Sequence, residues 1–162
     1  MIVLRPDGAF AFSRPAHLLA FGFGAGLSPV APGTVATALA WPVGWVLSGS
    51  LGPVAMLALA AVLFVIGIWC CGVTGSRLGV PDHGALVWDE IVAFLLILAV
   101  VPRELAWHAA AFVAFRVFDI AKPPPIRWLE RRVRGGLGVM LDDLAAAGYA
   151  LLVLAVAKRL HG

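Results

Sequence analysis

Charged side chains are scarce in this chain of 162 residues, since Asp, Glu, Lys and Arg together make up 13% of it. Soluble domains contain about 25% charged and about 45–50% apolar residues. This chain is 62% hydrophobic and has a mean hydropathy of +0.98. From Pro15 to Ser76 there is no Asp, Glu, Lys or Arg at all. The composition excludes an ordinary soluble domain and predicts an integral membrane protein.

Cysteine is also scarce, and its placement excludes a disulfide framework. Cys70 and Cys71 are adjacent within an apolar run, and neighbouring cysteines seldom form a bridge with each other. Residues 1–14 lack the long apolar core of a signal peptide and are expected to form a short cytoplasmic segment. No internal repeat stands out. We therefore expect one membrane domain spanning residues 1–162.

Apolar runs separated by glycine, proline and polar residues predict an all-α, polytopic membrane protein with about four to five transmembrane helices. Residues 54–73 form the clearest span, because twenty uncharged residues at about 1.5 Å each cross a hydrocarbon core of about 30 Å. Further helices are expected over residues 34–47, 85–101, 105–120 and 142–157. The segment 34–47 is short, and the alternative that it is re-entrant would move the C-terminus to the other side.

The basic residues predict the orientation in the membrane. If the helices alternate, one side receives eight of them: Arg5, Arg14, Arg77, Lys122, Arg127, Arg131, Arg132 and Arg134. The other side receives three: Arg103, Lys158 and Arg159. The positive-inside rule places the first group in the cytoplasm. The basic residues cluster at the edges of apolar runs, so the sequence pI of 9.4 favours anionic lipid headgroups over nucleic acid as partner.

Carboxylates are predicted to converge at the cytoplasmic rim of the helices. Asp89 and Glu90 begin one predicted helix, Asp142 and Asp143 begin another, and Asp119 ends a third. Grouped oxygen ligands suit Mg²⁺, which binds one or two carboxylates together with water and substrate phosphate. In the alternative interpretation these acids only anchor helix ends or complement helix dipoles.

The stretch from residue 115 to residue 143 combines four of the nine acidic residues with half of the Lys and Arg residues. Arg116, Asp119 and Lys122 recur at three-residue steps and share one side of a helix, which places cations beside carboxylates. This pattern is typical of a site for metal and phosphate. Arg131, Arg132 and Arg134 are expected to form a lipid-facing basic edge, and Glu130 is expected to be solvated.

Two other functions remain open at this point. Cys71 and Arg77 have the six-residue spacing of cysteine-dependent phosphatases, although such chemistry needs a reactive thiolate in a phosphate-binding loop. A small ion-coupled transporter would use the carboxylates as ion sites. Transporters usually carry polar groups near the membrane midplane in repeated, broken helices, which this sequence does not predict.

Four ordered blocks carry a resemblance to a known family: FGFGAGLSPVAPGT (21–34), DHGALVWDE (82–90), FRVFDIAKPPPIRW (115–128) and GGLGVMLDD (135–143). They resemble the phosphatidylglycerophosphatase A family of bacterial inner membranes. The resemblance implies a Mg²⁺-dependent lipid phosphatase that converts phosphatidylglycerophosphate to phosphatidylglycerol. Departures from the family pattern occur at Ala25, Ala36, Ala93 and Pro124. None removes a charge, so an active enzyme is expected.

With this resemblance, each polar residue receives an expected role. The expected Mg²⁺ ligands are Asp89, Glu90, Asp119, Asp142 and Asp143. Phosphate is expected to bind the side chains of Arg116, Lys122 and Arg127 and backbone N–H groups at Ser28, Gly33 and Thr34. The expected catalytic groups are Asp89, Glu90, Asp119, Asp143 and His83, one of which would position the attacking water. A covalent aspartyl-phosphate is the alternative route.

Overall fold

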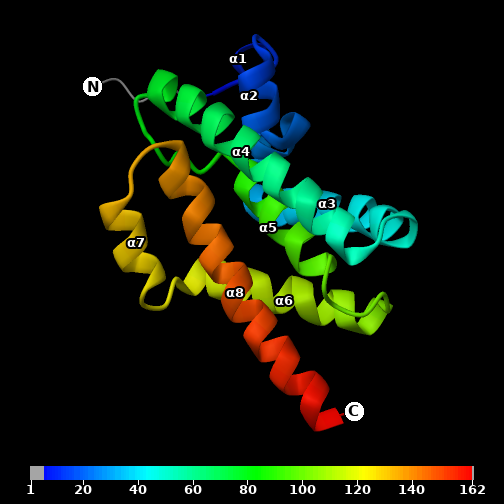
Figure 1. Ribbon diagram of the computed structural model, residues 1–162. Helices are drawn as coiled ribbons and strands as arrows, with labels where there is room; N and C mark the ends of the chain where they lie inside the picture. Colours follow the sequence, from blue (N-terminus) through cyan, green and yellow to red (C-terminus); the bar gives the residue numbers. More distant parts are fainter. Residues whose placement is uncertain (1–5, 162) are drawn as a thin grey trace.

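The structure is a computed structural model that describes residues 6–161, and its regular elements in that range are all helical (Figure 1). Residues 1–5 of the predicted cytoplasmic segment, including Arg5, and Gly162 lie outside the described residues. The elements are α1 (Gly8–Ala11), α2 (Pro15–Ala20), the 3₁₀ helix η1 (Gly22–Leu27), α3 (Pro32–Ser50), α4 (Pro53–Leu78), α5 (Trp88–Leu98), α6 (Leu105–Ala121), α7 (Ile126–Arg132) and α8 (Gly136–His161).

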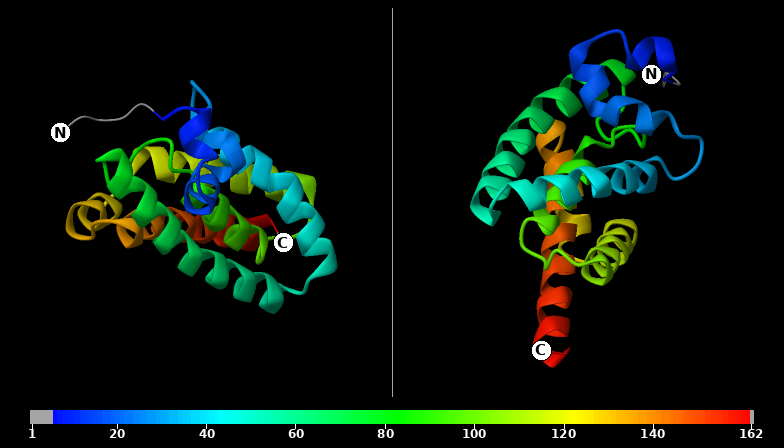
Figure 2. Two further views of the ribbon diagram at one scale, coloured as in Figure 1. Left: turned by 90° about the horizontal axis from the view of Figure 1, so that it is seen from above. Right: turned by 90° about the vertical axis from the view of Figure 1, so that its right-hand side faces the viewer.

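Helix α5 lies at the centre of the molecule, where it packs against α3, α4, α6 and α8 (Figures 1 and 2). Apart from Asp89 and Glu90, every residue of its sequence WDEIVAFLLIL is apolar, and Phe94, Ile97 and Leu98 are fully buried. A helix that is apolar on all sides needs apolar neighbours on all sides. The two acids, Asp89 and Glu90, are therefore carried into the interior by the first turn of the central helix.

Helices α4 and α8 form the longest walls around α5. Within residues 6–161 these two helices are long and apolar enough to cross a membrane. Large apolar side chains such as Val54 and Val65 on α4 and Leu152 on α8 are exposed, which suits contact with lipid. The all-helical architecture and the membrane character predicted from the sequence are confirmed. The count of about four to five transmembrane helices stays a prediction, because two helices of the described residues meet the length and hydropathy of a span.

Several predicted helix bounds differ from those in the structure. Helix α6 matches its prediction within one residue, whereas α5 covers 11 residues rather than 17 and is about 16 Å long. The chain before α5 is a turn in which the Leu86 N–H donates to the carbonyl of His83. Helix α8 begins at Gly136 and not at Asp142, so the expectation that Asp142 and Asp143 begin a helix is wrong.

The early start of α8 follows from its close contact with α4. Gly135 adopts a positive φ of 73°, which glycine tolerates without steric cost, and Gly136 then lies directly on the α4 backbone. A Cβ at Gly136 would collide with the carbonyl of Ile68 and the N–H of Gly72. The two helices lie closest at this point and diverge toward the C-terminus of α8 (Figures 1 and 2).

Candidate active site: a buried acidic cluster

The polar ends of several helices converge, as the sequence predicts. The N-terminus of α3 meets the N-terminus of α5 and the C-terminal part of α6, because a Cβ at Gly33 would touch both the Glu90 carboxylate and the Arg116 guanidinium. The first-turn N–H groups of Gly33 and Thr34 have no acceptor within their own helix. The positive end of the α3 dipole therefore faces the acid of α5.

Three carboxylates form the core of the site. One oxygen each from Asp89, Asp142 and Asp143 lies within 4.8 Å of the others, and these residues are only 7%, 4% and 3% exposed. The Asp89 Oδ1 and Asp143 Oδ2 atoms are buried without a hydrogen-bond partner. Asp142 and Asp143 lie beyond the first turn of α8, so the helix dipole does not explain them.

Arg116 joins two further acids to this core. Its Nη1 atom lies 2.7 Å from Asp119 Oδ2 and 3.8 Å from Glu90 Oε1, and the three side chains are 11–13% exposed. Asp143 is close enough to Glu90 and Asp119 to be affected by the negative charge of both. The Oε2 atom of Glu90 is buried without a partner. All five predicted metal ligands thus belong to one cluster.

Lys122 closes the other side of the cluster. It ends α6 in a left-handed conformation with a φ of 42°, and its Nζ donates to Asp142 Oδ2 at 2.6 Å and to Glu130 Oε1 at 3.3 Å. Burial opposes the charge of Lys122, but the hydrogen bond to Asp142 and the nearby carboxylates outweigh that effect. They raise the pKa of Lys122 above its ordinary value.

Sequence reasoning missed a second acidic group around this lysine. Oxygens of Asp82, Glu130 and Asp142 lie within 4.8 Å of one another. The side chain of Glu130 is 41% exposed, so the expected solvation is partly correct, yet its carboxylate also binds Lys122. Asp82 belongs to the same polar sequence block as Asp89, residues 82–90, and this could have indicated that it lies near the other acids. The position of Glu130 depends on how α7 packs on α8, which has no local signal in the sequence.

Several residues expected at the site have other contacts. The exposed Arg127 donates to the carbonyl of Ala121, at 3.2 Å, and Ser28 Oγ donates to the carbonyl of Val30, at 2.8 Å. The ring Nδ1 of His83 accepts from the Ala85 N–H, at 3.2 Å. None of these contacts is with the carboxylate cluster. Arg131, Arg132 and Arg134 are exposed, as expected for a basic edge.

The structure does not provide the geometry of a cysteine-dependent phosphatase. Cys71 is fully buried and, like Arg77, belongs to the continuous helix α4. A thiolate nucleophile of that class requires a loop that surrounds phosphate with backbone N–H groups. Cys71 and Arg77 therefore lie six positions apart on one helix and are not joined by a phosphate-binding loop, which argues against the cysteine-dependent mechanism.

The charge balance of the cluster fits a bound divalent cation. Its five carboxylates, Asp89, Glu90, Asp119, Asp142 and Asp143, are accompanied by two cations, Arg116 and Lys122. Buried charges without counter-charges are costly, so the excess of negative charge calls for further positive charge. Opposite ligands of Mg²⁺ lie about 4.2 Å apart at bond lengths of about 2.1 Å. One oxygen each from Asp89, Asp142 and Asp143 lies within 4.8 Å of the others, so these three side chains fit as ligands of one ion.

Comparison with known proteins identifies the family. A phosphatidylglycerophosphatase A of Haemophilus influenzae is 43% identical over 151 residues, which cover 93% of each chain. One of Escherichia coli is 46% identical over 136 residues, covering 83% of this chain and 78% of that relative. A Bacteroides thetaiotaomicron relative, named as a candidate phosphatidylinositol-3-phosphatase, is 39% identical over 153 residues, covering 90% of this chain and 94% of its own. No solved structure matches the chain significantly. Because the family profile for phosphatidylglycerophosphatase A also matches residues 18–158, this chain belongs to the phosphatidylglycerophosphatase A family.

Proposed function

We propose that this protein hydrolyses the terminal phosphate monoester of phosphatidylglycerophosphate and depends on Mg²⁺ to do so. Water adds to phosphorus, the bond from phosphorus to the glycerol oxygen breaks, and a proton ends on that oxygen. The products are phosphatidylglycerol and phosphate. The observation that carries this proposal is the buried group of Asp89, Asp142 and Asp143, with unpartnered oxygens, in a member of this family.

The positions of the carboxylates suit them to bind the metal ion and to accept a proton. Asp89, Asp142 and Asp143 would hold the ion, with Glu90 and Asp119 beside them. When bound, Mg²⁺ would polarise the phosphate and lower the pKa of a coordinated water. An unpartnered carboxylate oxygen, such as Asp143 Oδ2, is available to accept the proton of the attacking water.

The cations and the α3 N-terminus would bind the phosphate. Arg116 and Lys122 lie on two sides of the acids, and each already pairs with a carboxylate. A phosphate that enters between them would also pair with Arg116 and Lys122, and the positive charges of these two side chains would offset part of the negative charge of the phosphate. The first-turn N–H groups at Gly33 and Thr34 add uncharged donors on the third side.

We place the site on the cytoplasmic side of a bacterial inner membrane. The support is the excess of basic residues at the polar rim, of which Arg131, Arg132 and Arg134 are exposed around α7. A membrane-impermeant maleimide should label an Arg134→Cys variant in inside-out vesicles and leave it unlabelled in intact spheroplasts. The reverse pattern would contradict this orientation.

Phosphate release by purified protein in detergent tests the proposed activity. Micelles containing phosphatidylglycerophosphate should release phosphate, whereas micelles of phosphatidylinositol 3-phosphate provide the comparison that the Bacteroides relative suggests. A clear preference for phosphatidylglycerophosphate supports the proposal. Release from phosphatidylinositol 3-phosphate alone would assign a different lipid, and release from neither by folded, monodisperse protein would contradict a lipid phosphatase.

A further inference from the structure

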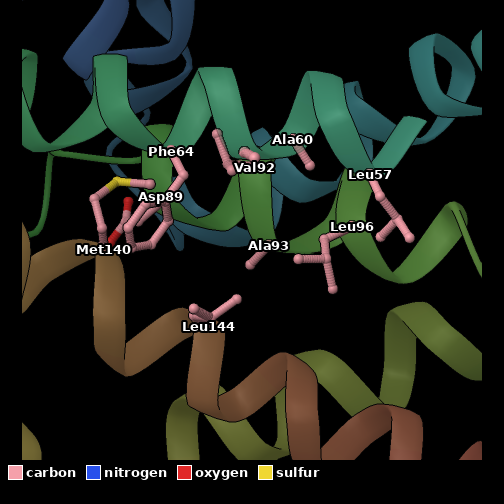
Figure 3. A pocket seen from close by; sticks show the side chains of 10 residues that line it. Leu57, Ala60, Phe64, Asp89, Val92, Ala93, Leu96, Met140 and Leu144 are labelled. Carbon is pink, nitrogen blue, oxygen red and sulfur yellow. The ribbon is translucent and has the colours of Figure 1, made fainter. Parts of the chain in front are cut away.

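An apolar groove extends from the acidic cluster between α4, α5 and α8 (Figure 3). Its volume is about 200 Å³. The lining residues are Leu57, Ala60, Ala61 and Phe64 of α4, Asp89, Val92, Ala93 and Leu96 of α5, and Met140 and Leu144 of α8. Asp89 is the single charged residue among them, and it also belongs to the proposed metal site.

The groove has a polar end and an apolar end. Figure 3 shows Asp89, Phe64 and Met140 together at one end, and Leu57 beside Leu96 at the other. From Asp89 to Leu96 the chain advances seven residues along α5, which is about 10 Å of helix. The small side chains of Ala60 and Ala93 leave the space between the helices open.

The walls of the groove are the two helices that are long and apolar enough to cross a membrane. Helices α4 and α8 lie closest at Gly136 and diverge from there, with α5 as the floor between them (Figures 1 and 3). Leu57 and Ala61 are exposed at the mouth, and Leu96 and Leu144 are partly exposed. In a bilayer this mouth opens toward hydrocarbon, so its natural occupant is apolar and comes from the membrane.

We propose that the groove binds a hydrocarbon chain of the phospholipid whose phosphate reacts at the acidic cluster. This inference rests on the proposed function, since it takes the substrate to be a lipid phosphate monoester. The groove follows α5 for about 10 Å from Asp89 to Leu96, so a hydrocarbon chain lying in it would be beside the site that takes the phosphate. A single side chain, Asp89, therefore borders both the reacting phosphate and the path of the lipid.

Filling the groove tests this inference. In Ala61→Phe and Leu96→Phe variants the larger side chains compete with the lipid chain. The KM for long-chain phosphatidylglycerophosphate should rise about four- to fifteenfold, because the lipid loses the burial of one or two methylene groups at about 0.8 kcal/mol each. The KM for the same lipid with two four-carbon chains, and kcat for both, should stay unchanged. Ala55→Phe, at another exposed alanine of α4, is the matched control and should change neither KM.

A second measurement reports on binding without catalysis. Phosphatidylglycerol with a photoreactive diazirine midway along one chain should crosslink to Leu57, Leu96 or Leu144, and excess phosphatidylglycerophosphate should reduce this crosslinking. Crosslinks that resist competition, or that are as frequent at the exposed Val62 and Val65 as at the groove residues, would overturn the inference. So would equal KM changes for long and short chains. If wild-type protein hydrolyses no phosphatidylglycerophosphate while the competed crosslinks persist, the proposed function fails and the lipid groove stands.

Discussion

At the scale of single residues, the notable feature is a set of acids that are buried and incompletely paired. Asp89, Glu90 and Asp143 each have a buried oxygen without a partner in the structure. A charged group in that position is costly for folding unless a ligand compensates it. These acids lower the free energy of unfolding of the protein without a ligand, and such a cost is expected at residues that serve function.

Removing the charge of acids in the cluster should strongly reduce activity. We predict that Asp89→Asn, Asp119→Asn and Asp143→Asn each reduce the rate of phosphate release by at least about 10²-fold, because an amide keeps the size but loses the charge that would hold the proposed Mg²⁺. The fold should survive in Asp89→Asn and Asp143→Asn, since an unpartnered buried charge is removed, whereas Asp119→Asn also weakens the ion pair with Arg116 and should lower stability. The rate under saturating Mg²⁺ and lipid is the measurement, with detergent monodispersity measured alongside.

The matched control for these variants is Glu104, an exposed acid at the other end of α6. It precedes Asp119 by fifteen residues, or about 22 Å of helix, and Glu104→Gln should change the rate by less than about twofold. Glu130 is unsuitable as a control because it binds Lys122. Three well-folded Asp→Asn proteins with rates like that of Glu104→Gln would show that the metal site lies elsewhere.

At the scale of helices, the close contact between α4 and α8 positions the site. Gly136 fixes where α8 begins, and Asp142 follows six residues later on the face toward α5. The sequence did not predict this start, because Gly135 and Gly136 together resemble a helix break. Whether such a pair ends a helix or permits contact between helices depends on the neighbouring backbone, which no local pattern contains. Helix α6 was predicted well because Pro102 and Pro123 bracket it.

A methyl group at this contact should separate the two helices. Gly136→Ala places a Cβ against the α4 backbone, which cannot rotate away, so we predict a loss of stability of about 1–3 kcal/mol and a matching fall in activity. Gly148→Ala is the control, because a Cβ there meets nothing within 4 Å and alanine favours the helix. Thermal unfolding in detergent measures both variants. Equal melting temperatures for the two would show that the close contact is not needed.

At the scale of the whole molecule, the acidic cluster separates two different environments. Beyond Asp142 lies a hollow of about 380 Å³ whose lining includes the charged side chains of Asp82, Glu130 and Arg134. Beyond Asp89 lies the apolar groove between α4 and α8. Composition alone predicted the membrane setting, and the spacing of polar blocks predicted that the acids meet. The groove depends on the angle and position at which α4 and α8 pack around α5, which no sequence pattern contains, so the structure was needed to find it.

The central claim is that these acids hold a divalent cation that phosphate release requires. The most direct measurement is the rate of phosphate release from phosphatidylglycerophosphate by protein stripped with EDTA and then titrated with Mg²⁺, compared between wild type and Asp143→Asn. We predict that stripped wild-type protein is inactive, that Mg²⁺ restores its activity saturably, and that Asp143→Asn stays inactive or needs far more Mg²⁺. Full activity of the stripped, metal-free wild type would contradict the account.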